Sequence, residues 1–302
     1  MIDNNTINYR LKDAIEYGMD KLKDSSPSPR LDVDLMLCKV MDFDRMKLMM
    51  SYDKPMHPEE IKEFERMLEQ RSMRKPIAYI INEKEFMGLN FYVNENVLIP
   101  RPDTEIIVEE VLDIIDRAPK EGENSPIKVM DMCLGSGAIA LSIAKLSSVD
   151  LQICGVDISK EAIDVARVNR RRLGLGACVD FVESDLFSSS DLEVYLDSLD
   201  ILVSNPPYIE DHVIEGLEPD VKDYEPILAL AGGDDGMDFY KSIIKSSPKF
   251  LKIGGWLVFE SGHDQAEKIK NEMEKVGFDC LYFKKDLQGY NRMVAGRLIH
   301  KN

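Results

Sequence analysis

An alternation of strand-like and helix-like segments from residue 127 onwards constrains the fold most. Longer segments of helical spacing, such as "GAIALSIAKL" and "SKEAIDVARVNRRRLG", separate short apolar runs. Five such runs have the length and composition of buried strands: "IKVMDM", "LQICGVDI", "CVDFVESDLF", "LDILVSNPPY" and "GGWLVFES". Because crossover helices usually join parallel strands, this alternation predicts a mostly parallel sheet with helices on both faces.

The end of the chain adds two more expected strands. Residues 278–299, "FDCLYFKKDLQGYNRMVAGRLI", contain two strand-like runs with a turn at Gln288-Gly289. With the five runs before them, they predict an α/β fold with a Rossmann-like sheet of seven strands. We expect this sheet to be mostly parallel, with an antiparallel C-terminal strand.

The first part of the chain has a different pattern. Residues 6–82 contain sequence signals for the starts and ends of helices. An example is "HPEEIKEFERMLEQRSMRKP", with Pro58 near its start and Pro76 at its end. Its many methionines suit either an adaptable surface or plain core packing. Residues around Gly88-Leu89-Asn90 then predict a short β-hairpin. We therefore expect a helical domain at 1–82, a hairpin linker at 83–98 and the α/β domain at 99–302.

Composition disfavours several classes of protein. The 302 residues contain 38 Lys and Arg against 55 Asp and Glu, a formal charge of −17, which disfavours nucleic acid as the main partner. Five scattered cysteines without C-x-x-C and four histidines without H-x-x-x-H indicate neither a disulfide framework nor a metal site. The polar first residues and the absence of a long apolar run favour a reduced, cytoplasmic protein without a membrane segment.

A glycine-containing loop follows the first strand of the α/β domain. In "VMDMCLGSGAIAL" this loop lies between strand and helix and comprises Cys133, Leu134, Gly135, Ser136 and Gly137. In open α/β sheets, ligands bind beyond the carboxyl ends of the strands, where glycine permits close approach and a helix N-terminus favours anions. Asp157 ends the next strand, where its carboxylate can accept both hydroxyls of a ribose. This arrangement suits NAD and S-adenosylmethionine alike, and a simple tight turn stays an alternative.

A third acidic position follows the next strand. In "ESDLF", Asp185 could accept a hydrogen bond from the exocyclic amine of an adenine, while Leu186 packs against the ring. The same residues could equally cap a helix.

The fourth strand ends in Asn205-Pro206-Pro207-Tyr208. Proline fixes its own φ, restricts the preceding residue to extended conformations and offers no N–H. The corner is therefore rich in acceptors and poor in donors, with the Asn205 side-chain oxygen and the Pro206 carbonyl able to accept from a planar NH₂ group. Tyr208 could stack on that group. A hydride-transfer enzyme needs no such corner, although an ordinary turn remains an alternative.

Together with "DMCLGSGAIAL" and "GVDIS" upstream, "SNPPY" resembles the S-adenosylmethionine-dependent methyltransferases that act on planar amino groups. The segments "RKPIAYIINEKEFMGLNFYVNENVLIPRPDTE", "YEPILALAGGDDGMDFY" and "GYNRMVAGRL" resemble the peptide chain release factor glutamine methyltransferases of the PrmC/HemK type over nearly the whole chain. The resemblance implies S-adenosylmethionine as cofactor, S-adenosylhomocysteine as product and no metal. It implies methylation of the side-chain nitrogen (N5) of the glutamine in a release factor's Gly-Gly-Gln loop, with the helical domain recognising that protein. We expect a monomer.

The resemblance also implies roles for individual residues. The expected catalytic residues are Asn205, Pro206 and Tyr208, and the expected substrate-binding residues are these three together with Pro207. The expected cofactor-binding residues are Thr104, Cys133, Leu134, Gly135, Ser136, Gly137, Asp157, Asp185, Leu186 and Asn205. Cys133 stands where the family often has a glycine, and Leu186 where relatives can carry a larger ring.

The segment "LIPRPDTE" contributes further candidate residues for binding the cofactor or the substrate. Arg101, Thr104 and Glu105 could order the methionine end of the cofactor or the substrate loop. Alternatively, Asp103 or Thr104 caps the next helix and Arg101 points outward.

Three other functions compete with this one. A DNA adenine methyltransferase needs a similar corner, but also a flipped base and a basic groove, which the charge of −17 disfavours. A glutamine methyltransferase acting on a ribosomal protein is harder to exclude. A non-catalytic binding module would not need Asn205, Asp157 and the glycine pair intact.

Overall fold

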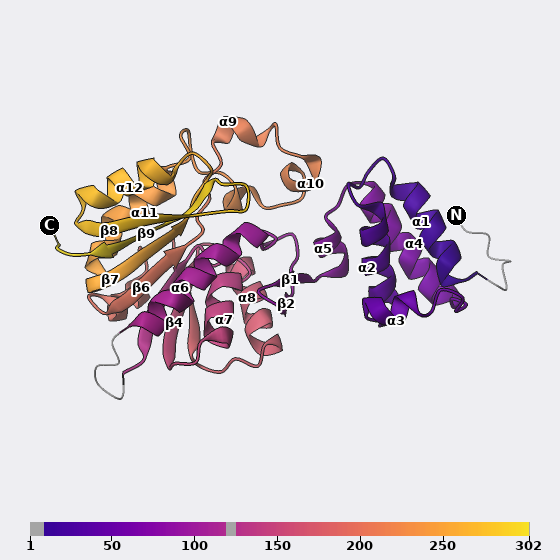
Figure 1. The fold of residues 1–302 in the computed structure, drawn as a ribbon, viewed down its shortest axis with the longest axis horizontal. Helices are drawn as coiled ribbons and strands as arrows, with labels where there is room; N and C mark the ends of the chain where they lie inside the picture. Colours follow the sequence, from indigo (N-terminus) through magenta and orange to yellow (C-terminus); the bar gives the residue numbers. More distant parts are fainter. Residues whose placement is uncertain (1–8, 119–124, 302) are drawn as a thin grey trace. The chain divides into compact units, whose positions relative to one another are not determined.

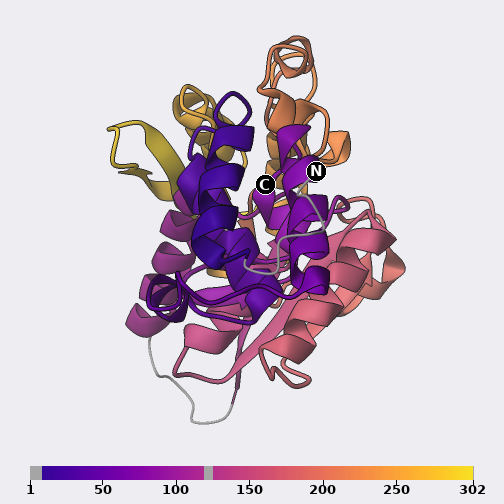
Figure 2. The same ribbon diagram turned by 90° about the vertical axis from the view of Figure 1, so that its right-hand side faces the viewer.

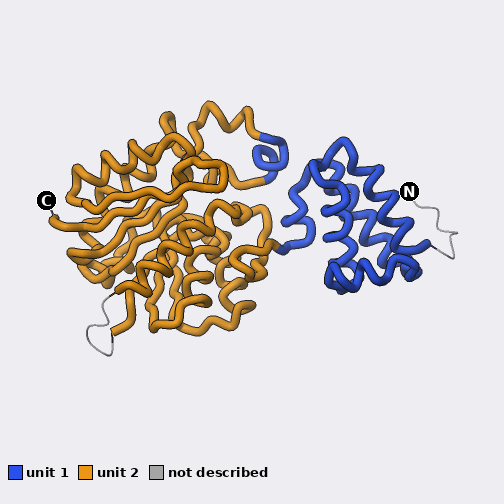
Figure 3. The backbone as a smooth tube through the Cα atoms, in the orientation of Figure 1, with its two compact units in different colours: residues 1–83, 218–224 blue, residues 84–217, 225–302 orange. Residues whose placement is uncertain are grey.

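The computed structural model describes residues 9–118 and 125–301. It divides the chain into two compact units (Figure 3). Unit 1 comprises residues 1–83 and 218–224, and unit 2 comprises residues 84–217 and 225–302. Segment 218–224 was assigned to the α/β domain from the sequence, but the structure groups it with the helical unit.

Unit 1 is a bundle of helices, seen from two directions in Figures 1 and 2. Its elements are α1 (Leu11–Leu22), α2 (Pro29–Met41), α3 (Arg45–Met49), α4 (Pro58–Ser72), α5 (Ile77–Ile81) and, from the returning segment, α10 (Pro219–Lys222). Gly18 of α1 lets three helices approach closely. A Cβ at Gly18 would lie 2.7 Å from Val33 Cγ2 of α2 and 3.1 Å from Phe64 Cζ of α4.

Ion pairs hold the returning segment in unit 1. The Arg71 side chain is only 4% exposed and contacts Asp32 at 2.6 Å and Asp220 at 2.8 Å. Arg74 contacts Asp220 at 2.7 Å, and the Tyr224 hydroxyl donates to the Met73 carbonyl at 2.6 Å. Because Arg71 joins two acids that are far apart in the sequence, hydrophobic periodicity could not reveal this arrangement.

Unit 2 contains a seven-stranded sheet in the order β5-β4-β3-β6-β7-β9-β8 (Figure 1). The strands are β3 (Ile127–Met132), β4 (Leu151–Asp157), β5 (Val179–Glu183), β6 (Leu199–Ser204), β7 (Leu251–Glu260), β8 (Phe278–Lys285) and β9 (Asn291–Leu298). The five strands from β5 to β7 pair in parallel, and only β9 runs antiparallel to its neighbours β7 and β8. The predicted fold class is confirmed.

Two apolar cores cover the faces of this sheet. Alternate strand residues, such as Val129 and Met130 in β3, enter opposite cores because successive side chains of a strand point to opposite faces. The helices α6 (Glu105–Arg117), α7 (Ala138–Leu146) and α8 (Lys160–Arg172) pack on the first face. The helices α11 (Asp238–Ser246) and α12 (Ala266–Lys275) pack on the second. Helix α12 was not predicted from the sequence.

Short elements complete unit 2. They are η1 (Pro102–Thr104), η2 (Ser190–Tyr195), α9 (Asp211–Ile214), η3 (Ile227–Ala229), η4 (Ser247–Lys249) and the hairpin strands β1 (Lys84–Phe86) and β2 (Leu89–Phe91). The predicted hairpin is present, but its turn is Met87-Gly88, both with positive φ, and Leu89 pairs with Phe86. Across the described residues, no helix is long and apolar enough to cross a membrane.

Candidate active site

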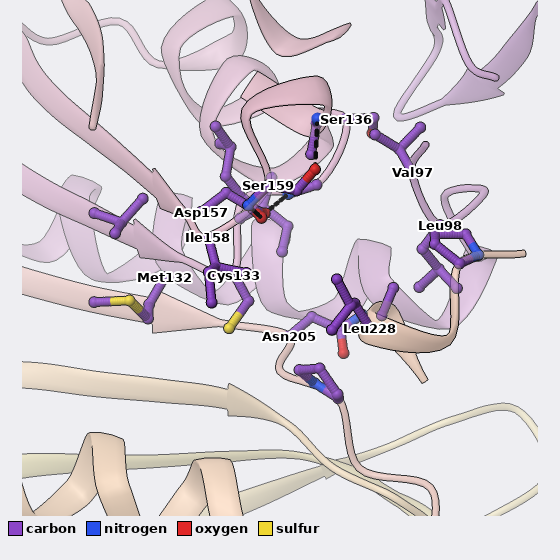
Figure 4. Close-up of a pocket in the computed structure, with 18 of the residues that line it drawn as sticks. Val97, Leu98, Met132, Cys133, Ser136, Asp157, Ile158, Ser159, Asn205 and Leu228 are labelled. Carbon is purple, nitrogen blue, oxygen red and sulfur yellow. Dashed lines mark hydrogen bonds between the residues drawn. The ribbon is translucent and has the colours of Figure 1, made fainter. Parts of the chain in front are cut away.

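A pocket of unit 2 lies at the carboxyl ends of β3, β4 and β6 (Figure 4). After β3 the chain builds β4 and β5 on one side, and then returns to place β6 on the other side of β3. The strand order therefore reverses between β3 and β6, which is where open α/β sheets bind ligands. Segments around Val97 and Leu228 complete the walls.

The glycine loop takes the shape that its sequence predicts. Cys133, Gly135 and Gly137 have φ values of 65°, 55° and 79°. The left-handed region costs little for glycine, but roughly 1–2 kcal/mol for a residue with a Cβ such as Cys133. A Cβ at Gly137 would also lie 2.9 Å from Leu141 Cδ1 and 3.2 Å from Ala166 Cβ. Because Gly137 has no Cβ, helix α7 can begin immediately after the loop without a clash with Leu141 or Ala166.

Asp157 joins this loop to the end of β4. One carboxylate oxygen accepts from the Gly135 N–H at 2.8 Å and the other from the Ser159 N–H at 2.9 Å. Burial raises the pKa of Asp157, while these backbone donors oppose the shift. Each carboxylate oxygen retains acceptor capacity, so both can still accept from a ribose hydroxyl.

Asn169 also holds the loop, and sequence analysis missed it. This fully buried residue of α8 donates to the carbonyls of Ser136 and Tyr92, each at 2.9 Å, and accepts from the Tyr92 N–H at 2.6 Å. It therefore ties the glycine loop to the segment that follows the hairpin. The only feature of the sequence that could have identified Asn169 was its position as an asparagine on the apolar side of the helix "EAIDVARVN".

Asp185 and Leu186 line the pocket just beyond β5. The strand ends at Glu183, whereas the expected run "CVDFVESDLF" extended to Phe187, and Leu186 has a φ of 48°. The next helix, η2, is capped by Ser189, so the alternative that Asp185 caps a helix is wrong.

The Asn-Pro-Pro-Tyr corner follows β6 directly. Ser204, the last residue of the strand, donates to the Met132 carbonyl at 2.6 Å and fixes β6 against β3. Asn205 and Pro207 line the pocket, and Pro206, which like Pro207 is buried, is not among the lining residues. Tyr208 is turned towards β7, because its hydroxyl donates to Glu260 Oε1 at 3.4 Å. Stacking of Tyr208 on a substrate stays a prediction.

The segment before α6 contributes residues from far along the sequence. Thr104 occupies the position before α6 without making a capping bond, so the capping alternative is wrong. Its Oγ1 instead accepts from Asn205 Nδ2 at 3.4 Å. Arg101 does not point outward, since it contacts the buried carboxylate of Glu225 at 2.6 Å. Glu105 accepts from the Met87 N–H at 2.8 Å and so holds the hairpin.

The pocket has the features that S-adenosylmethionine requires. A backbone loop with positive φ values, the carboxylate of Asp157 and the side chain of Leu186 lie around one cavity. The thiol of Cys133 remains protonated at neutral pH, because burial raises its pKa. The charges of the pocket therefore come from Asp157, Asp185 and Arg101 among the lining residues described.

Comparison with known proteins identifies two family matches. A model described as the PrmC N-terminal domain matches residues 13–81, and one described as a methyltransferase domain matches residues 123–296. A solved methyltransferase from Pyrococcus furiosus aligns with a TM-score of 0.50 at 15% identity, covering 72% of this chain and 92% of that chain. At this identity the likeness shows a shared fold.

Curated relatives are similar along almost the whole chain. The release factor glutamine methyltransferase of Clostridium acetobutylicum is 40% identical over 286 residues, which cover 94% of this chain and 97% of that protein. The protein of the same name from Geobacter sulfurreducens is 40% identical over 269 residues, 89% of each chain. These matches confirm the resemblance seen in the sequence. The chain therefore belongs to the release factor glutamine methyltransferase family and is an S-adenosylmethionine-dependent methyltransferase.

Proposed function

We propose that this enzyme methylates the side-chain amide nitrogen (N5) of the glutamine in the Gly-Gly-Gln loop of a class 1 peptide chain release factor. The observation that carries the proposal is that Asn205, the glycine loop and Asp157 lie around one pocket of unit 2. The names of the curated relatives support the same substrate.

In this proposal the cofactor side of the pocket is formed by the loop and the strand ends. Asp157 accepts from the ribose hydroxyls, Asp185 from the adenine amine, and Leu186 packs against the adenine ring. Loop residues 133–137 approach the cofactor through their backbone, and Thr104 and Asn205 lie towards the transferred group. S-adenosylmethionine, when bound, supplies an electrophilic methyl group.

The corner at the end of β6 orients the substrate amide. An amide nitrogen is a poor nucleophile because its lone pair is delocalised into the carbonyl. Two acceptors, Asn205 Oδ1 and the Pro206 carbonyl, take the two N–H donors and present the nitrogen for in-line transfer. Such orientation can lower a barrier by several kcal/mol, up to about 7–11 in favourable intramolecular systems.

The proton that the nitrogen must lose goes to solvent. A new N–C bond forms as the S–CH₃ bond of the sulfonium breaks and leaves S-adenosylhomocysteine, and one N–H proton leaves the amide for each methyl group transferred. The described residues that line the pocket include no His, Lys or Glu to act as a base, and its two carboxylates, Asp157 and Asp185, are assigned to the ribose and the adenine. Orientation by the corner therefore accounts for most of the rate acceleration in this proposal.

Recognition of the release factor is assigned to the helical unit. One glutamine amide carries too little information to select a protein, so a second surface has to read the partner. The charge of −17 suits a protein partner better than nucleic acid. We expect the enzyme to act as a monomer in the cytoplasm, without a metal.

The test is a competition among substrates. The enzyme is incubated with labelled S-adenosylmethionine and an equimolar mixture of release factors, ribosomal proteins and duplex DNA. Label is expected in a release factor. Preferential labelling of a ribosomal protein or of adenine in DNA would replace this proposal with the corresponding competing function.

A further inference from the structure

A buried ion pair in the wall of the pocket has no role in the mechanism above. The Glu225 side chain is 1% exposed, and its Oε1 accepts from Arg101 Nη2 at 2.6 Å. Its other oxygen, Oε2, accepts from the Ile99 N–H at 3.4 Å. Breaking a buried pair leaves a charge without its partner, which costs far more than the loss of a surface pair. The pair therefore fixes the segment around Arg101 to Glu225.

Glu225 begins a wall of the pocket, defined here as residues 225–231. Figure 4 shows Leu228 of this wall in the same pocket as Asn205. The wall follows directly on segment 218–224, which belongs to unit 1. Because the residues before it make their contacts in the other unit, the start of the wall has to be fixed by contacts of its own. Three residues of the wall line the pocket: Pro226, Leu228 and Ala229.

The other end of the wall is tied to the Asn-Pro-Pro-Tyr corner. Ile209 follows the corner directly, and its N–H donates to the Leu230 carbonyl at 2.9 Å. Its carbonyl accepts from the Gly232 N–H at 2.8 Å, and Ile209 forms an isolated parallel bridge with Ala231. The far end of the wall is therefore held by the main chain, whereas the near end is held by the side chain of Glu225.

These contacts close a ring around one side of the pocket, which we call the contact ring. From Asn205 it passes to Thr104 at 3.4 Å and then along the chain to Arg101. It crosses from Arg101 to Glu225 at 2.6 Å, follows the wall, and returns along the chain from Ile209 to Asn205. Of these two side-chain contacts, the one made by Glu225 is the shorter. The contact ring therefore depends chiefly on the Arg101–Glu225 pair.

We propose that Glu225 is a positioning residue that, through Arg101, holds the contact ring closed and fixes the opening by which the substrate amide reaches Asn205. The inference rests on the proposed function, because the contact ring includes Asn205 but neither Asp157 nor Asp185, which are assigned to the cofactor. If the contact ring is open for part of the time, only the closed fraction accepts the substrate loop. The apparent Kd for the substrate then rises by the inverse of that fraction.

Glu225→Gln in the full-length enzyme tests this role through the KM for the release factor. The variant keeps the shape of the side chain and removes its charge. KM should rise by about tenfold, the effect of weakening a hydrogen bond between charged groups. By contrast, kcat should change little, because Asn205 is intact in the closed complex. The Kd of S-adenosylhomocysteine, measured by calorimetry, should also stay close to the wild-type value.

Substitutions of Arg101 examine the partner in the pair. Arg101→Met should raise KM as Glu225→Gln does, and Arg101→Lys should recover part of that loss because it keeps the positive charge. The double variant Arg101→Met/Glu225→Gln replaces the buried pair with neutral groups, which proteins often tolerate better than one unpaired charge. Its KM should be no higher than that of Arg101→Met, because both residues act through one contact.

Glu110→Gln serves as a matched control. The Glu110 side chain on α6 is 1% exposed, and its Oε2 lies 2.6 Å from Lys284 Nζ. The Lys284 side chain is 35% exposed, against 36% for Arg101. Because Glu110 is not among the described residues that line the pocket, the same change there should leave KM and kcat at their wild-type values. Thermal unfolding reports whether each variant is folded.

The outcomes separate this inference from the proposed function. A folded Glu225→Gln enzyme with wild-type KM overturns the inference and leaves the proposed function intact. Equal losses of affinity for the release factor and for S-adenosylhomocysteine also overturn it, because the effect would not be confined to the amide side of the pocket. If the wild type itself methylates no release factor, the proposed function and the inference both fall.

Discussion

The glycine loop and the Asn-Pro-Pro-Tyr corner lie in the same pocket but are shaped in different ways. The backbone shapes the loop: Gly135 and Gly137 have positive φ, and the Gly135 N–H donates to Asp157 at 2.8 Å. At the corner, the prolines fix the backbone, but the Asn205 side chain contacts a residue from another segment. Its Nδ2 donates to Thr104 Oγ1 at 3.4 Å. Cofactor binding should therefore respond to backbone changes, and catalysis to side-chain changes made at a distance.

The largest effect expected from this comparison is at Asn205. Asn205→Ala removes one of the two acceptors for the substrate amide, and kcat should fall by about 10²–10³-fold, as when a single transition-state hydrogen bond is removed elsewhere. The affinity for S-adenosylhomocysteine should change little, because the loop is intact. Steady-state methylation and calorimetry measure the two quantities. Near-normal turnover would contradict the role of the corner.

The second-largest effect is expected for substitutions in the glycine loop. Gly137→Ala should destabilise the protein by about 1–2 kcal/mol from the left-handed conformation, with a further cost from the contact to Leu141, and should weaken cofactor binding. Gly135→Ala is the matched control, since its φ is 55° but nothing lies within 4 Å of the added Cβ. It should cost less stability than Gly137→Ala in urea unfolding. Equal losses would mean that packing beneath the loop is unimportant.

The smallest effect is expected at Tyr208. Tyr208→Phe keeps the ring and removes only the donor to Glu260, whose long distance of 3.4 Å marks a weak bond. A decrease in kcat of about two- to threefold is expected. Tyr208→Leu, which also removes the ring, separates packing from hydrogen bonding. A loss for Tyr208→Phe as large as that for Asn205→Ala would instead place the hydroxyl in the reaction.

The difference between local backbone patterns and contacts between distant segments explains which features could be predicted from the sequence. The alternation after residue 127 predicted the sheet because strands and helices are coded by local periodicity. The Gly135 and Asp157 positions were predicted because ends of neighbouring parallel strands meet at one edge. Local patterns were also sufficient for the hairpin, although its turn was placed one residue late.

Interactions between distant segments were not predictable. Thr104 was expected among the cofactor-binding residues, with capping of α6 as the alternative, but its contact with Asn205, which is 101 residues away, was not predicted. Glu260 lies in the predicted strand "GGWLVFES", and its burial became visible only in the structure. The pairing of Arg71 with Asp220 likewise joins residues 149 positions apart.

The most direct test of the account is to locate the transferred methyl group. A release factor is incubated with the enzyme and methyl-deuterated S-adenosylmethionine, and the product is fragmented by mass spectrometry. A second release factor, with Glu in place of the Gly-Gly-Gln glutamine, lacks the NH₂ group that the corner should bind. The account predicts one labelled methyl on the side-chain nitrogen of that glutamine and none on the Glu variant. Label on another residue, or equal labelling of both proteins, would contradict it.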